Sequence, residues 1–140
     1  MNIKKSLGQH FLQHARIAER IVHAANRDPD TTVLEIGPGR GILTRVLLKQ
    51  VEKVVAVEAD HSLCIELRAT FGDEIAAGRL TLTEDDVRAF NLDSLPCGYA
   101  VAANIPYYLT GELFRQMLTA NNQPSSMTLL VQKEVAERIA

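Results

Sequence analysis

The chain has 140 residues, 46% of them hydrophobic and 23% charged, and this composition is typical of a single globular domain and excludes a disordered or fibrous chain. No apolar run approaches the roughly 20 residues that cross a bilayer, and no apolar stretch follows the lysines near Met1, which argues against a membrane span and a secretory signal. The net charge is −2, yet residues 1–27 carry five basic side chains against one acidic side chain.

Helical and strand-like segments alternate along the chain. Apolar residues at helical intervals predict helices, and short β-branched runs that end at glycine or acidic residues predict buried strands. We expect helices over Ala15–Ala25, Gly41–Gln50, Ser62–Phe71, Thr110–Ala120 and Gln132–Ala140, and strands over Thr32–Ile36, Lys53–Glu58, Leu80–Thr83, Tyr99–Ala103 and Met127–Val131. This alternation predicts an α/β fold with a mostly parallel sheet, helices on both faces and the doubly wound strand order 3-2-1-4-5.

Polar residues or glycines stand at or just after the ends of four predicted strands. These residues are Gly37, Glu58, Asp86 and Asn104. In open parallel sheets the ligand lies outside the carboxyl ends of the strands, near the point where the strand order reverses. The sequence therefore predicts a binding site at this edge of the sheet.

The loop after the first strand is rich in glycine and reads E-I-G-P-G-R-G over residues 35–41. Glycines such as Gly37 and Gly39 let the backbone approach a ligand closely. A dinucleotide-binding loop would need glycine three positions after Gly39, where this chain has Ile42, so the pyrophosphate fingerprint fails. The spacing E-x-G-x-G-x-G instead resembles motif I of class I methyltransferases; an ordinary glycine turn is the structural alternative.

Acidic residues follow the second and third predicted strands. The Glu58 carboxylate is placed to accept hydrogen bonds from both hydroxyls of a ribose. Either Asp85 or Asp86 is placed to accept from an adenine amine, although aspartate also favours helix N-caps and turns.

The segment after the fourth strand, Asn104-Ile-Pro106-Tyr107, has the residue types needed to methylate an aromatic amine. The Asn104 side-chain oxygen and the Pro106 carbonyl oxygen would accept the two amine hydrogens and direct the nitrogen lone pair to the methyl group. Tyr107 would stack on the extruded base. Catalysis would then come from positioning and electrostatics, without a metal ion or a covalent nucleophile. In isolation, an Asn–Pro turn with a buried tyrosine is the simpler explanation.

Taken together, these segments resemble the small-subunit ribosomal RNA adenine N6-dimethyltransferase family, which is related to the erythromycin-resistance methylases. The stretches that carry the resemblance are KKSLGQHFL (4–12), VLEIGPGRGILT (33–44), VVAVEAD (54–60), DVRAF (86–90), NIPYYLT (104–110) and LLVQKEVAERI (129–139). The resemblance implies a Rossmann-like class I fold that uses S-adenosyl-L-methionine, with ribosomal RNA of the small subunit as the partner. It also implies donor-binding roles for His10, Leu12, Gly37, Glu58, Asp86 and Asn104, and it favours Asp86 over Asp85 because Phe90 follows Asp86 by four positions.

The chain departs from this family in two respects. His10 stands where the family usually has asparagine, although a neutral imidazole still donates one hydrogen bond. Family members are about twice as long, so we expect this chain to lack the last strands and the helical C-terminal domain. The predicted strand Met127–Val131 would then be an exposed edge, and we expect the chain either to self-associate through it or to be markedly less stable than a complete catalytic domain.

Two other functions remain open. A DNA adenine methyltransferase has a similar catalytic loop, and a noncatalytic relative would bind nucleic acid as a transcription or assembly factor. The GQHFL and QKEVAERI stretches favour the RNA group, and Glu58, Asp86 and the N-I-P-Y segment count against a noncatalytic protein. Residues 1–27 would form a basic lead segment and helix whose charge suits phosphates, although charge alone favours a solvated helix face. Cys64 and Cys97 lack metal-ligand spacing, so we expect two reduced thiols, no metal site and a cytoplasmic location.

Overall fold

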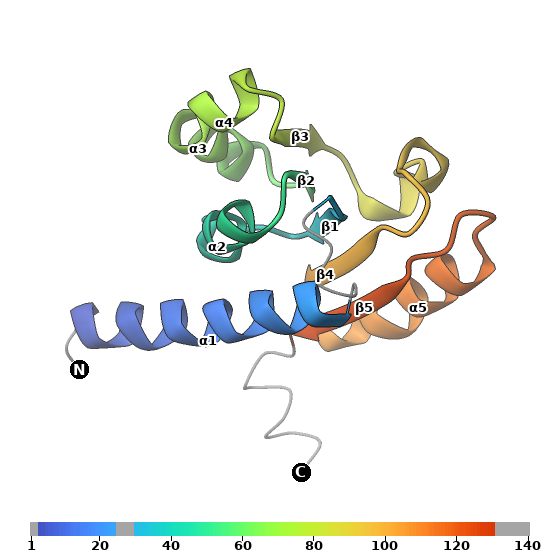
Figure 1. Ribbon diagram of the computed structural model, residues 1–140, viewed down its shortest axis with the longest axis horizontal. Coiled ribbons are helices and arrows are strands. Elements are labelled where there is room, and N and C mark those ends of the chain that lie inside the picture. The colour runs from blue at the N-terminus through green and yellow to red at the C-terminus, as the bar shows by residue number, and fades with distance from the viewer. Residues whose placement is uncertain (1–2, 25–29, 131–140) are drawn as a thin grey trace, which may run out of the picture.

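The computed structural model describes residues 3–24 and 30–130, except for the side chains of residues 3–13, Tyr107 and Leu130. Its centre is a parallel sheet of five strands in the order β3-β2-β1-β4-β5, which confirms the predicted order (Figure 1). The strands are β1 (Thr32–Ile36), β2 (Lys53–Glu58), β3 (Leu80–Glu84), β4 (Ala100–Asn104) and β5 (Ser126–Leu130). Each predicted strand boundary agrees to within one residue.

The helices differ more from the sequence-based prediction. They are α1 (Ile3–Ala24), α2 (Ile42–Gln50), α3 (His61–Thr70), α4 (Gly72–Ala76) and α5 (Thr110–Thr119), with 3-10 turns η1 (Val87–Ala89), η2 (Leu92–Ser94) and η3 (Tyr107–Leu109). The first helix begins at Ile3 and not at Ala15, so that prediction was wrong by three turns, and α4 and the 3-10 turns were not predicted. The helix predicted over Gln132–Ala140 lies outside the described residues. Within the described segments, no helix is both long and apolar enough to cross a membrane.

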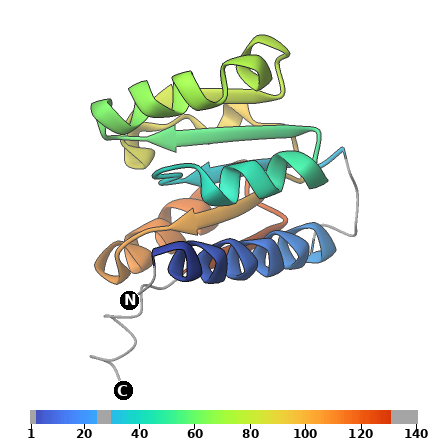
Figure 2. The same cartoon turned by 90° about the vertical axis from the view of Figure 1, so that its left-hand side faces the viewer.

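Helices cover both faces of the sheet. In Figure 2, α1, α2 and α3 lie side by side in one layer in front of the strands, whereas α5 lies behind them. Strand residues alternate between the two layers: Val33 packs with Leu47 of α2 and Ile21 of α1, whereas Leu34 packs with Met117 of α5. Because both faces are buried, the central strands are mostly apolar, as is usual for parallel sheets, with Glu35 of β1 as a buried exception.

The loops that follow the strands are fixed by local hydrogen bonds. The Asp60 carboxylate caps α3 by accepting from the backbone N–H groups of Ser62 and Leu63, at 2.9 and 3.1 Å. The Asn122 amide donates to the carbonyl oxygens of Leu92 and Leu95, at 3.0 and 2.9 Å, and thereby holds the crossover between β3 and β4.

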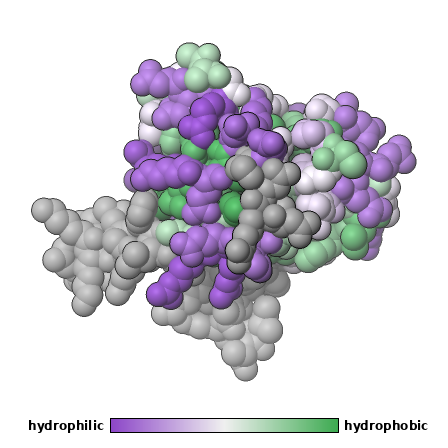
Figure 3. All heavy atoms as spheres, in the orientation of Figure 1, coloured by the Kyte–Doolittle hydropathy of each residue, from purple (hydrophilic) through white to green (hydrophobic). Residues whose placement is uncertain are grey.

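Figure 3 shows mostly hydrophilic residues over the described part of one face, with a smaller hydrophobic area near its middle.

Candidate functional site

A cleft of about 420 Å³ opens where β1, β2, β3 and β4 end. Seven residues that were singled out from the sequence line it, namely Gly37, Gly39, Glu58, Asp85, Asp86, Asn104 and Pro106. Their convergence follows from the topology, because parallel strands bring their carboxyl ends to one edge. The structure thus assembles these residues in one place, whereas the role of each remains a prediction.

Three other predicted site residues are described only through their backbone. His10 and Leu12 lie within α1, and Tyr107 begins the 3-10 turn η3 that follows Pro106. The side chains of all three lie outside the described part of the structure. Their predicted contacts with a methyl donor or a base therefore rest on the sequence alone.

The Glu58 carboxylate is held at the floor of the cleft by two backbone groups. Its Oε1 accepts from the N–H of Gly39 at 3.2 Å, and its Oε2 accepts from the N–H of Asp60 at 3.0 Å. The side chain is only 8% exposed, and each carboxylate oxygen keeps a second lone pair. Glu58 is therefore a fixed double acceptor, which is the arrangement that two neighbouring hydroxyls need.

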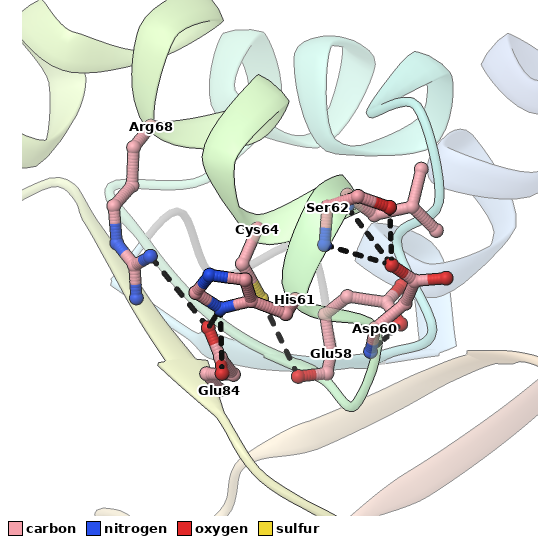
Figure 4. Close-up of polar contacts among 8 residues, drawn as sticks. Glu58, Asp60, His61, Ser62, Cys64, Arg68 and Glu84 are labelled. Atoms are coloured by element: carbon pink, nitrogen blue, oxygen red, sulfur yellow. Dashed lines mark hydrogen bonds and ion pairs between the residues drawn. The ribbon is translucent and has the colours of Figure 1, made fainter.

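The turn that follows Glu58 and the first residues of α3 hold the backbone of Glu58 in place. Figure 4 shows that Asp60, Ser62 and Cys64 lie on the turn that follows Glu58 and on the first residues of α3. The Cys64 thiol donates to the Glu58 carbonyl oxygen at 3.5 Å. On the neighbouring strand end, Glu84 pairs with His61 and does not line the cleft.

The glycine loop touches the loop after β4. Gly37 has a φ of 69°, and a Cβ atom at this position would lie 2.9 Å from the Asn104 carbonyl oxygen. Only glycine adopts this backbone conformation without strain and also leaves room for the neighbouring carbonyl. The glycine loop and the end of β4, which both line the cleft and follow paired strands, are therefore closely packed.

A second carboxyl group lies beneath the glycine loop but does not line the cleft. Glu35 is 2% exposed, and the Thr44 hydroxyl donates to its Oε1 at 2.5 Å. Burial raises the pKa of Glu35 to about 7, the Thr44 hydrogen bond opposes this rise, and the negative charge of Glu58 adds to it. The Glu35 carboxyl group therefore holds its proton more readily than an exposed carboxyl group does.

The structure distinguishes Asp85 from Asp86. Asp85 turns back on its own backbone, because its Oδ1 accepts from the N–H of Asp86 at 2.8 Å. Asp86 caps η1 and pairs with Arg88, whose Nε lies 3.0 and 3.1 Å from the two carboxylate oxygens and whose terminal nitrogen lies 2.6 Å from Oδ2. These hydrogen bonds lower the pKa of Asp86 to about 2. Both acidic residues line the cleft, so the predicted adenine acceptor is an ionised carboxylate that already has a cationic partner.

The two predicted amine acceptors follow β4. Asn104 ends the strand and is exposed at the cleft, and Pro106 follows two residues later. The Pro106 carbonyl oxygen accepts from the N–H of Leu109 at 3.0 Å, which closes the turn η3. One lone pair of this oxygen is therefore used by the fold, and the second remains for a ligand.

The cleft is acidic as a whole. Glu58, Asp85, Asp86 and Glu112 line it together with one basic residue, Arg88, which also lies 3.9 Å from Glu112. A surplus of negative charge in a partly enclosed site favours a cationic ligand. Among the residues described, no cluster of three histidine, cysteine or acidic side chains is arranged to hold a metal ion.

A family model and the curated relatives that match this chain agree on one family. The model of the ribosomal RNA adenine dimethylase family matches residues 1–140. The chain is 43% identical to a ribosomal RNA small subunit methyltransferase A of Thermosynechococcus vestitus, over 97% of this chain and 51% of that protein. It is 44% identical to the protein of the same name from Synechococcus sp., over 97% of this chain and 50% of that one. The chain thus spans about half the length of the curated relatives it matches.

Solved structures support the same grouping. The 23S rRNA methyltransferase ErmE superposes with a TM-score of 0.70 and 30% identity, over 89% of this chain and 47% of that chain. A dimethyladenosine transferase from Plasmodium falciparum gives a TM-score of 0.66 and 30% identity, over 88% and 43%. The predicted class I methyltransferase fold is therefore confirmed.

Among the polar residues that line the cleft, sequence reasoning missed three, Arg88, Glu112 and Gln116. Arg88 follows Asp86 by two positions, and no rule of sequence spacing marks it as the partner of that carboxylate. Glu112 and Gln116 are on α5, where one helical turn separates them and places both on the same side. Only the contact between α5 and the turn η1, where the Gln116 amide donates to the Val87 carbonyl oxygen, reveals that this side faces the cleft.

Proposed function

Because the chain belongs to the ribosomal RNA adenine dimethylase family, we propose that it binds S-adenosyl-L-methionine and methylates the N6 amine of adenine in ribosomal RNA. The observation that carries this proposal is the position of Glu58. A rigid double acceptor lies in an acidic cleft that the glycine loop and the Asn104–Pro106 segment also line. Such a site suits a ligand with a ribose and a positive charge, and the methyl donor has both.

The proposed reaction needs no covalent intermediate on the protein. The methyl donor supplies an electrophilic methyl group on a sulfonium centre. The Asn104 side-chain oxygen and the Pro106 carbonyl oxygen accept the amine hydrogens, Tyr107 stacks on the base, and the amine lone pair is directed to the methyl carbon. Gly37 and Gly39 leave room for the donor, and His10 and Leu12 contact it from α1. The acidic groups of the cleft attract the cationic donor. As the nitrogen–carbon bond forms, the carbon–sulfur bond breaks, S-adenosyl-L-homocysteine leaves, and the methylated amine loses a proton to solvent.

We propose that the partner is ribosomal RNA of the small subunit and that the protein acts in the cytoplasm. On the described part of α1, the exposed side chains of Arg16, Arg20 and His23 form a shallow hollow together with Glu19. Basic side chains on a rigid helix are suited to contact phosphates. RNA would thus bind along α1 while the acidic cleft retains the methyl donor.

The first test concerns Glu58. We expect Glu58→Ala to weaken donor binding by about 1–3 kcal/mol, because two buried hydroxyls would lose a charged acceptor. Isothermal titration calorimetry with S-adenosyl-L-homocysteine measures this loss. Glu84→Ala is a matched control, because Glu84 ends the neighbouring strand and does not line the cleft. Equal affinity in the wild type and in both variants would remove Glu58 from the site.

A second test concerns the edge strand β5. In the described part of the chain, β5 pairs with β4 alone and ends the sheet. An unpaired strand edge is a template for another strand, so we propose that two copies of this chain associate through β5. Light scattering over a concentration series should show a rising mean mass. A constant monomer mass at high concentration would show that this edge is protected.

A further inference from the structure

Tyr108 is the most exposed of the large hydrophobic side chains in the described part of the chain. It is 70% exposed, compared with 61% for Leu118, 54% for Ile65 and 40% for Phe114. Single exposed hydrophobic residues are ordinary on protein surfaces, so exposure alone gives Tyr108 no function. Its position in the fold is what distinguishes Tyr108 from the other three.

Tyr108 lies at the edge of the cleft, directly after the segment that is proposed to hold the target amine. The 3-10 turn η3 follows Pro106 and is closed by the hydrogen bond from the Leu109 N–H to the Pro106 carbonyl oxygen, at 3.0 Å. Such a turn rises only about 2 Å per residue, so Tyr108 stays close to Pro106. Successive residues of the turn point about 120° apart, and Leu109 lines the cleft whereas Tyr108 does not. The exposed Tyr108 ring therefore lies beside the cleft and outside it.

The first turns of α5 continue this exposed surface and add a positive charge. Gly111 and Arg115 follow Tyr108 by three and seven residues, spacings that share one side of a helix. Both are exposed, and nothing lies within 4 Å of a Cβ atom built at Gly111. None of the ion pairs between described residues involves Arg115, whereas Glu112 of the same helix lies 3.9 Å from Arg88. An open aromatic side chain and a cation thus share one surface next to the cleft.

We infer that Tyr108 and Arg115 bind the nucleotide that adjoins the target adenine in the RNA, with the Tyr108 ring stacked on its base and Arg115 paired with its phosphate. This inference rests on the proposed function, in which Asn104 and Pro106 hold the target amine. When one base is turned into a cleft, its neighbours in the strand stay outside and meet the residues at the edge. Exposed aromatic rings beside cationic groups form the usual platform for single-stranded nucleic acid, and the charge of Arg115 favours a polyanion.

The test measures RNA binding by a protein that extends this chain to the length of its relatives. One RNA is a single strand rich in uridine that carries one adenine, and two further RNAs lack the base on the 5′ side or on the 3′ side of that adenine. Fluorescence anisotropy gives the dissociation constants in the presence of S-adenosyl-L-homocysteine. The matched controls lie in the helical layer on the opposite face of the sheet from α5: Ile65→Ala on α3 for Tyr108→Ala, and Lys49→Gln on α2 for Arg115→Gln (Figure 2).

We expect Tyr108→Ala to weaken binding of the intact RNA by at least about fivefold, because stacking of one base on an aromatic side chain contributes that much or more. The wild type should bind one of the two RNAs that lack a base equally weakly, and Tyr108→Ala should not weaken that RNA further. Tyr108→Phe keeps the ring and should bind as the wild type does.

Arg115→Gln should reduce the slope of log affinity against log salt concentration by about 0.7, the contribution of one phosphate contact on a single strand. Tyr108→Ala removes no charge and should leave this slope unchanged. Both control variants should keep the affinity and the slope of the wild type, and thermal melts show whether each variant is folded.

Three outcomes would overturn the inference. If Tyr108→Ala weakens all three RNAs by the same factor, its ring stacks on no neighbouring base. If Arg115→Gln keeps the salt slope, its guanidinium binds no phosphate. If Tyr108→Ala leaves RNA binding unchanged, Tyr108 is not an RNA contact, and a lower mean mass in light scattering would then identify it as a contact between protein copies.

The proposed function is tested separately by calorimetry with S-adenosyl-L-homocysteine. If no variant and no wild-type protein binds this ligand, the proposed function is wrong, whereas the outcomes above concern Tyr108 and Arg115 alone. A wild type that binds the ligand but none of the RNAs would contradict both the RNA partner and this inference.

Discussion

Asn104→Ala should lower the rate of methyl transfer to ribosomal RNA by at least about 100-fold while it changes donor affinity only a few-fold. The rate is measured with a protein that extends this chain to the length of its relatives. Asn104 lies at the cleft, one strand away from the glycine loop, where its side-chain oxygen can accept from the target amine. Such a contact strengthens as the amine becomes tetrahedral, so its loss affects the transition state more than the bound donor.

Two further variants show whether the oxygen itself is needed. Asn104→Asp keeps an acceptor and should retain more turnover than Asn104→Ala. Asn91→Ala should leave turnover unchanged, because Asn91 is exposed and only caps the 3-10 turn η2. Substantial turnover by Asn104→Ala would contradict the proposed role.

Gly37→Ala should be among the most destabilising single substitutions in the described part of the chain. The left-handed backbone conformation costs an alanine roughly 1–2 kcal/mol. The added Cβ would also lie 2.9 Å from the Asn104 carbonyl oxygen, which is backbone and cannot rotate away as a side chain would. We therefore expect the free energy of unfolding in urea to fall by about 2–4 kcal/mol, with a loss of donor affinity.

Gly98→Ala is the control that separates the cost of the backbone conformation from the cost of the contact between the added Cβ atom and the Asn104 carbonyl oxygen. Gly98 has a φ of 84°, but nothing lies within 4 Å of a Cβ at that position. This variant should show only the backbone cost and keep its donor affinity. Equal destabilisation by the two substitutions would mean that the loop after β4 moves aside to accommodate the methyl group.

The strands and their order could be predicted from the sequence because both faces of the sheet are buried. Short apolar runs such as Thr32–Ile36 then stand out from the amphipathic helices between them. The same topology brings Gly37, Glu58, Asp86 and Asn104 to one edge, so the place of the site followed from the order of the elements. The strand order and the place of the site thus follow from local hydrophobic patterns and from the rule that ligands bind at the carboxyl ends of parallel strands.

Other features depend on contacts that no local pattern records. The extension of α1 back to Ile3 is an exception, because Ile3, Leu7 and Phe11 repeat every four residues; the prediction stopped at Ala15 and overlooked this pattern. The position of Gln116 at the cleft is accompanied by a hydrogen bond to the Val87 carbonyl oxygen, and Val87 lies 29 positions earlier in the sequence. The pairing of Arg88 with Asp86 likewise depends on rotamers that the sequence does not encode in its spacing.

The contact between Gly37 and Asn104 also has a consequence for the way the chain acquires its site. The pairing of β1 with β2 joins neighbours in the sequence, whereas its pairing with β4 needs residues up to Asn104. Contacts between distant parts of a chain form late, and during synthesis one edge of β1 stays open until β4 has left the ribosome. The cleft therefore does not exist in any shorter nascent chain. A ligand that fills the cleft binds only when β1 and β4 are paired. Such a ligand therefore shifts the equilibrium between the unfolded and folded states of the newly made protein toward the folded state.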